Sequence, residues 1–138
     1  MNDFFAEIQE LFGLIYFQGL SNDLYNNEVY FSMSLFLFLF TFIWIVAYYY
    51  IIKSPKWGTI LRWSLWVFIG CIINFITSYF IAYNEMYSYY VIVLNKNLPY
   101  SNEFIGVGLS NFITSLILSI LYSAMIKWKS TNSSKIPF

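Results

Sequence analysis

Polar side chains recur every four residues within two otherwise apolar stretches of this chain. A four-residue step drifts slowly around a helix, so each set would form a stripe along one helix face. The set has six members: Asn74, Ser78, Asn111, Ser115, Ser119 and Ser123. Amides and hydroxyls donate and accept hydrogen bonds and can orient water, but they cannot carry a proton as a carboxylate does.

Two interpretations of this stripe stay open. Small residues permit close approach of helices, and hydroxyls form hydrogen bonds across a helix interface inside a membrane. Alternatively, an intramembrane polar stripe lines a hydrated path for protons or water within a larger assembly. On the face opposite the stripe of the third stretch, Ile113, Ile117, Ile120 and Leu121 are apolar, which both interpretations require.

The composition removes most self-contained chemistry. Histidine is absent, Cys71 is the single cysteine, and no glycine-rich phosphate loop is present. Histidine-ligated metals, Ser-His-Asp triads and cysteine clusters are therefore excluded. We predict no catalytic residue, no metal site and no cofactor, and whether the chain belongs to an enzyme as a non-redox subunit stays open.

The polar stripe lies within long stretches of consecutive uncharged residues. The three runs are 24, 22 and 23 residues long, and they comprise Val29–Ile52, Trp63–Asn84 and Phe104–Ile126. A helix of that length measures about 33–36 Å, enough for a hydrocarbon layer of about 30 Å. The sequence therefore predicts an all-α membrane protein with three transmembrane helices, at about 29–52, 59–84 and 104–127, within a domain of residues 28–127.

An amphipathic N-terminal helix is expected to precede these spans, within a segment of residues 1–27. Its apolar positions recur at steps of three and four residues: Phe4, Ile8, Leu11, Phe12 and Ile15. We expect this helix to lie in the headgroup layer or, by slight preference, against a protein partner, because its other side is acidic. Residues 21–28 should form a polar link, and residues 128–138 a polar tail.

The basic residues indicate an orientation. The first 28 residues contain no Lys or Arg, the first connection and the C-terminal tail hold six, and the second connection holds only Lys96. The positive-inside rule then places the N-terminus outside and the C-terminus inside. Trp57 and Arg62 are predicted interface anchors. The outer loop, roughly 85–103, contains YYVIVL, which we interpret as a strand or as a segment resting on a neighbour.

This layout resembles subunit 4L of respiratory complex I, NADH:ubiquinone oxidoreductase, called subunit K in bacteria. The family carries a basic turn and a second helix with a Leu-Met-Ser-Ile-Glu-Leu-type stretch leading to Asn-Leu-Asn-Phe, and KSPKWGTILRWSLWVFIGCIINF (53–75) lies over that pattern. Leu61, Asn74 and Phe75 fall on like residues. SNFITSLILSI (110–120) fits the third helix, with Asn111 at the position of its glutamate, and Leu65 falls at the position of the second-helix glutamate.

The resemblance implies a subunit of the proton-pumping membrane arm that lacks both proton-handling glutamates. Its expected partners are lipids and other membrane subunits of a large hetero-oligomeric complex, with no nucleic acid. The absence of histidine and the 28 Phe and Tyr residues favour an AT-biased mitochondrial gene, hence the mitochondrial inner membrane, or an AT-rich bacterium and its inner membrane. The alternatives are a structural accessory subunit of an oxidase or ATP synthase, and a small homo-oligomeric bacterial channel whose axis the Asn111–Ser123 stripe would face.

Overall fold

The computed structural model describes residues 2–11, 14–51 and 60–126, and this part of the chain is helical with short connections. Two short helices precede three long ones, and two of the long helices end in a π-helical turn. The elements in chain order are α1 (Asn2–Gln9), α2 (Gln18–Asn26), α3 (Val29–Val46), η1 (Ala47–Ile51), α4 (Ile60–Tyr87), η3 (Ser88–Val93) and α5 (Glu103–Ile126).

Three helices are long and apolar enough to cross a membrane. They comprise Val29–Tyr50, Ile60–Val93 and Glu103–Ile126. The 28 residues of α4 make a helix of about 42 Å, longer than a hydrocarbon layer of about 30 Å, so it fits with tilt. The predicted fold class, three spanning helices preceded by a short N-terminal helix, is confirmed.

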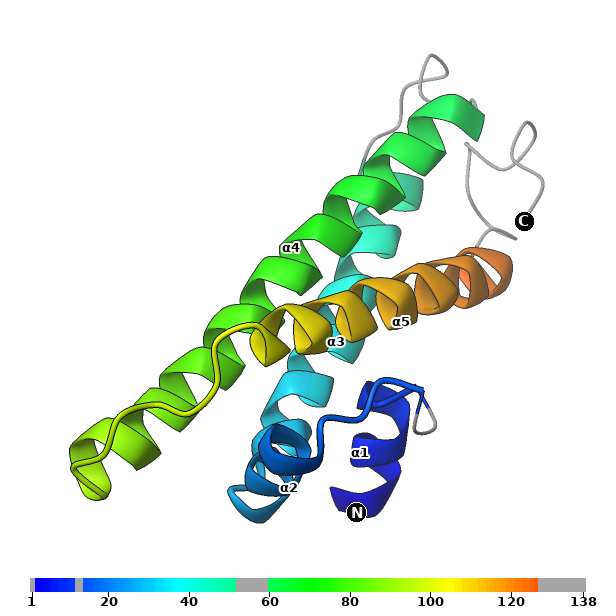
Figure 1. The fold of residues 1–138 in the computed structure, drawn as a ribbon. Helices are drawn as coiled ribbons and strands as arrows, with labels where there is room; N and C mark the ends of the chain where they lie inside the picture. The colour runs from blue at the N-terminus through cyan, green and yellow to red at the C-terminus, as the bar shows by residue number, and fades with distance from the viewer. Residues whose placement is uncertain (1, 12–13, 52–59, 127–138) are drawn as a thin grey trace.

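The long helices form a bundle in which α4 and α5 are the most extensively packed pair. In Figure 1, α5 (yellow to orange) crosses in front of α3, while α4 runs beside both. Gly108 permits the close approach of α5 to α4, since a Cβ at this position would lie 3.2 Å from the backbone oxygen of Phe75. We call the end where α3 and α5 begin and α4 finishes the capped end, and the opposite end the far end.

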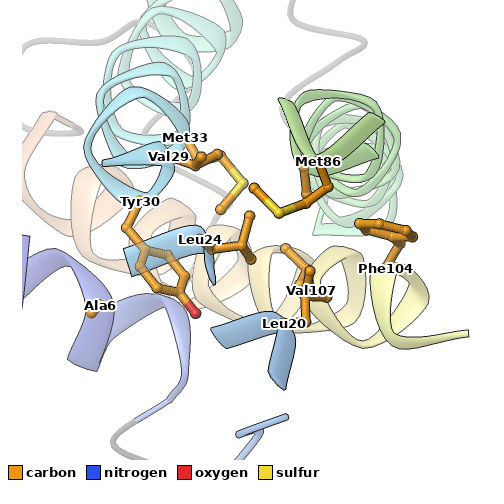
Figure 2. Close-up of a cluster of buried hydrophobic side chains, with 10 residues drawn as sticks. Ala6, Leu20, Leu24, Val29, Tyr30, Met33, Met86, Phe104 and Val107 are labelled. Atoms are coloured by element: carbon orange, nitrogen blue, oxygen red, sulfur yellow. The ribbon is translucent and has the colours of Figure 1, made fainter. Parts of the chain in front are cut away.

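The capped end is closed by α1 and α2. Figure 2 shows apolar side chains from all five α-helices meeting there, with Met33 of α3 and Met86 of α4 pointing toward one another. Leu20 and Leu24 of α2 fill the centre of this cluster and are at most 1% exposed. The N-terminal segment is therefore packed onto the spans of its own chain.

The amphipathic face predicted for the N-terminal helix differs from the observed one. Helix α1 ends at Gln9, before Leu11, whose φ of 50° is left-handed. Ala6 and Gln9 are its buried residues, whereas Phe4 is 60% exposed. Phe12 lies outside the described residues. The helix lies against α3 and α5 of its own chain. This location differs from the two that the sequence suggested, the headgroup layer and a separate protein partner.

Two connecting segments are helical, which excludes the strand that was one of the two alternatives for YYVIVL. The expected polar link at 21–28 is mostly helix α2, and the YYVIVL segment is not a strand but the π-helical turn η3. The β-branched and aromatic residues of that segment favour a strand, yet continuing α4 keeps the backbone hydrogen bonded without a pairing strand. As a result, the second span begins near its predicted position but extends past 84 to Val93.

Of the two predicted interface anchors, Arg62 lies within the described residues and Trp57 does not. Arg62 lies exposed in the first turn of α4, where its stem can reach toward an interface. Trp57, the basic turn at 53–58 and the tail at 128–138 lie outside the described residues.

Candidate functional site

All six polar residues predicted from the sequence lie inside the bundle. Each is at most 2% exposed, and Asn111 and Ser123 are fully buried. Together with Thr41 of α3, these six residues make up what we call the polar seam. Ile113, Ile117 and Leu121, on the opposite side of α5, are 41–53% exposed. The structure thus turns the polar stripe inward and the apolar stripe outward.

The centre of the polar seam joins all three spans. The side-chain amide of Asn74 in α4 donates to Thr41 Oγ1 of α3 at 3.1 Å and to Ser115 Oγ of α5 at 2.7 Å. The Thr41 and Ser115 hydroxyls lie 3.5 Å apart. Lipid offers these side chains no competing hydrogen-bond partner. The three residues therefore form a central node that connects the helices directly.

Hydrogen bonds also join the helices at both ends of the seam. At the far end, the indole of Trp63 donates to Ser123 Oγ at 3.1 Å. At the capped end, the side chain of Gln9 donates to Ser34 Oγ at 3.0 Å, and the Ser110 hydroxyl donates to the backbone oxygen of Gln9. Helix α1 therefore places a buried glutamine at the capped end, and the Oε1 atom of Gln9 accepts no hydrogen bond from the described residues.

Two asparagine oxygens in the seam are left without a partner. Asn111 donates from its amide nitrogen to the Val107 oxygen of its own helix at 3.0 Å. Neither Asn111 Oδ1 nor Asn74 Oδ1 accepts a hydrogen bond from any described residue, although both atoms are buried. Buried carbonyl oxygens are usually satisfied, so these two mark an incomplete part of the site.

A tryptophan pair links α3 to α4 on the other side of the bundle. Trp44 donates from its indole to the Trp66 oxygen at 2.9 Å, and Trp66 donates to the Trp44 oxygen at 3.0 Å. The rings stack with centroids 4.3 Å apart. Gly70 makes room for this arrangement, because a Cβ there would lie 2.7 Å from two atoms of the Trp44 ring.

Acidic residues of the N-terminal segment accept hydrogen bonds from tyrosines at the capped end. Asp23 of α2 accepts from Tyr90 and from Tyr100, at 2.5 Å each, and Glu10 accepts from Tyr30 at 2.7 Å. Burial, followed by the bond to Asp23, raises the pKa of Tyr100 above its ordinary value. The two bonds to Asp23 fasten α2 to η3 and to the connection that follows it, and the bond from Tyr30 to Glu10 joins α3 to the segment after α1.

Thr41, Gln9 and the tryptophan pair were not predicted from the sequence. Thr41 lies seven residues after Ser34 in α3, a spacing that places two hydroxyls on one helix face and could have signalled a third polar stripe. Gln9 gave no comparable signal, since its burial depends on where α1 packs. The tryptophans bond through backbone oxygens, which no side-chain pattern encodes.

Comparisons of the chain with protein-family models, with curated proteins and with solved structures found no match. The fold and the site alone define the class: a multi-pass membrane protein with three candidate membrane-spanning helices, in which the buried Asn, Gln, Ser and Thr side chains of the described residues are uncharged.

Proposed function

We propose that this chain is an integral membrane subunit of a respiratory-chain complex, in the position of a diverged 4L-like subunit in the membrane arm of NADH:ubiquinone oxidoreductase. In this role it holds neighbouring subunits in register and transfers no proton of its own. Its membrane is the mitochondrial or bacterial inner membrane, with the N-terminus outside and the C-terminus inside, as the distribution of Lys and Arg favours.

One observation carries this proposal: the polar seam lies inside the bundle, and large apolar side chains make up much of the outer surface of the three spans. On α3, Phe31, Leu35, Leu39 and Ile43 are 44–63% exposed and line a groove of about 440 Å³. Such a surface suits lipid and the helices of neighbouring membrane subunits. It supports a role in assembly.

The two positions aligned with the family's glutamates support the absence of proton transfer. Asn111 is fully buried in the seam, whereas Leu65 is 53% exposed on the outside of α4. Neither side chain titrates, and the two face different surroundings. A proton path that used both positions would lack an acceptor at each, so neighbouring subunits would have to carry it.

The homo-oligomeric channel is less well supported by this geometry. That alternative needs the residues from Asn111 to Ser123 to face an axis between copies of the chain. They face α3 and α4 instead, and Asn111, Ser115, Ser119 and Ser123 are each at most 2% exposed. A structural accessory subunit of an oxidase or ATP synthase stays as the alternative, because it requires the same apolar outer surface.

Purification of the affinity-tagged full chain from its own inner membrane tests the proposal. We expect it to migrate in native gels with NADH dehydrogenase activity and with antiporter-like and quinone-proximal subunits. Migration with oxidase or ATP synthase activity would favour the alternative, and a homo-oligomer without partners would refute both.

An Asn111→Leu variant separates the two interpretations of the seam within the complex. If Asn111 serves packing, less of the variant assembles while each assembled complex pumps normally. Intact assembly with reduced proton transfer would instead show that Asn111 belongs to a hydrated path. Ile113→Leu, an exposed substitution two residues away, is the matched control and should change neither quantity.

A further inference from the structure

The centre of the polar seam contains more hydrogen-bond acceptors than the described residues satisfy. Asn74 uses its amide nitrogen twice, to Thr41 and Ser115, but its Oδ1 is buried and has no partner there. Exchanging the oxygen and nitrogen of this amide leaves the nitrogen without a partner instead, so the deficit does not depend on that assignment. Asn111 Oδ1 has the same deficit, while its nitrogen is occupied by Val107.

Helix geometry brings these two amides to the same part of the bundle. Ser115, which bonds to Asn74, lies one turn from Asn111 on α5, about 6 Å along the helix axis. Helices α4 and α5 are antiparallel, so the step from Asn74 to Ser78 leads toward the same end as the step from Ser115 to Asn111. These four residues therefore lie at neighbouring levels of the bundle interior, and each is at most 2% exposed.

The missing partner has to be a small, neutral molecule that can donate a hydrogen bond to Asn111 Oδ1 and can either donate to or accept from the Asn74 amide. A cation would bring a charge into a region where no span carries a carboxylate between Val29 and Ile52, between Trp63 and Asn84 or between Phe104 and Ile126, and an unpaired buried charge is strongly unfavourable. A buried water molecule typically makes about three hydrogen bonds to polar groups that would otherwise be unsatisfied. Two amide oxygens with neighbouring hydroxyls supply such a set.

We propose that the seam binds water at the Asn74 and Asn111 amides, between α4 and α5, and that this water is enclosed rather than part of a continuous path. Gln9, which bonds to Ser34 and Ser110, lies at the capped end of the interior, and the bond from Trp63 to Ser123 lies at the far end, so side chains occupy both ends of the seam. This inference does not rest on the respiratory assignment, because it follows from the bundle interior alone.

Radiolytic labelling of the full chain in its native membrane tests the proposal, with water as the probe. Synchrotron irradiation converts bound water to hydroxyl radicals, which oxidise adjacent side chains even when these are buried. Cys71 is the reporter, because it is fully buried and contacts the Ser115 hydroxyl. Met33 and Met86 are the controls, because they are equally buried in the apolar cluster of Figure 2.

With each rate normalised to the same residue in the SDS-denatured chain, we expect oxidation of Cys71 to be several-fold faster than that of Met33 and Met86. Equal rates would overturn the proposal. Brief mixing with H₂¹⁸O before irradiation should leave most of the oxygen incorporated at Cys71 as ¹⁶O, since enclosed water exchanges slowly. Immediate ¹⁸O incorporation would overturn the enclosed site in favour of a continuous path.

The Asn111→Leu variant removes one of the two acceptors and should lower labelling of Cys71 several-fold. Ile113→Leu, an exposed substitution two residues from Asn111 and outside the seam, is the matched control and should leave the normalised rate at Cys71 unchanged. Unchanged labelling in Asn111→Leu would contradict the proposed location. If that variant does not fold, the comparison of Cys71 with Met33 and Met86 in the unmodified chain still decides the question.

Discussion

Replacement of Gly70 by alanine should separate α3 from α4, although it adds only one methyl group. The new Cβ would lie 2.7 Å from both Cδ1 and Nε1 of Trp44, closer than carbon atoms approach in packed interiors. The indole cannot easily swing away, because its nitrogen bonds to the Trp66 oxygen at 2.9 Å and its face stacks on the Trp66 ring. The methyl therefore competes directly with the tryptophan pair.

The magnitude follows from the contacts that the displaced indole would lose. One interhelical hydrogen bond in a membrane contributes about 0.6–1.7 kcal/mol, and a stacked aromatic pair about 0.5–1.5 kcal/mol. Their sum is about 1–3 kcal/mol, which agrees with the usual cost of overpacking. The higher helix propensity of alanine offsets little of this, since the spans stay helical when the bundle separates within SDS micelles.

The assay is the SDS mole fraction at which the full chain in mixed micelles loses protection from pulse proteolysis. Gly70→Ala should lower the free energy of bundle separation by about 1–3 kcal/mol. In a Trp44→Leu background the same substitution should be nearly neutral, because the obstructing ring is gone, so the double-mutant cycle isolates the contact. Ile69→Val, a methyl change on the exposed neighbouring residue, is the control. An unchanged or raised stability of Gly70→Ala in the unmodified background would refute the reasoning.

Three further perturbations test other contacts. Gly108→Ala places a Cβ 3.2 Å from the Phe75 backbone oxygen and should cost about 1–3 kcal/mol in the same assay; full stability would show that α4 and α5 are not in close contact there. Asn74→Ala removes two interhelical hydrogen bonds and should cost about 1–3 kcal/mol, and a stabilised variant would contradict the central node. Asp23→Asn should speed hydrogen exchange in residues 94–102, while exchange in the centre of α5 stays constant. Folding raises the pKa of Tyr100 from 10.0, so the stabilisation that its protonated hydroxyl contributes is present below pH 10 and is lost as the pH rises further. The same loop should therefore exchange faster in alkali. Faster exchange on acidification through neutral pH would contradict this assignment.

The spans could be predicted because their signal accumulates over many residues. More than twenty consecutive positions without charge identify each helix whatever the local preferences are. The inward direction of the polar stripe also follows from physics, since Asn111 and Ser115 would be unsatisfied against lipid. The fold class and the inward direction of the polar stripe can thus be predicted without knowledge of the tertiary contacts.

The placement of α1 and α2 could not be predicted in this way. Leu11 and Glu28 adopt left-handed φ values of 50° and 56° where these helices meet the next segment, and neither residue type favours that conformation. The bonds from Tyr90 and Tyr100 to Asp23 span 67 and 77 residues of sequence. Tertiary contacts of this kind determine where the short helices end, and a local pattern carries no trace of them.

The non-ionisable character of the seam connects stability with the proposed role. Hydrogen bonds of hydroxyls and amides stabilise helix–helix contacts inside a membrane, where Asn74 bonds to Thr41 and Ser115 without competition from bulk water. A carboxylate at Asn111 would need a partner or a proton at this depth, and helices α3 and α4 offer hydroxyls and amides facing it rather than a cation. The geometry around Asn111 therefore suits a residue that holds helices together, and the role proposed for this chain depends on the apolar surfaces that it presents to lipid and to neighbouring helices.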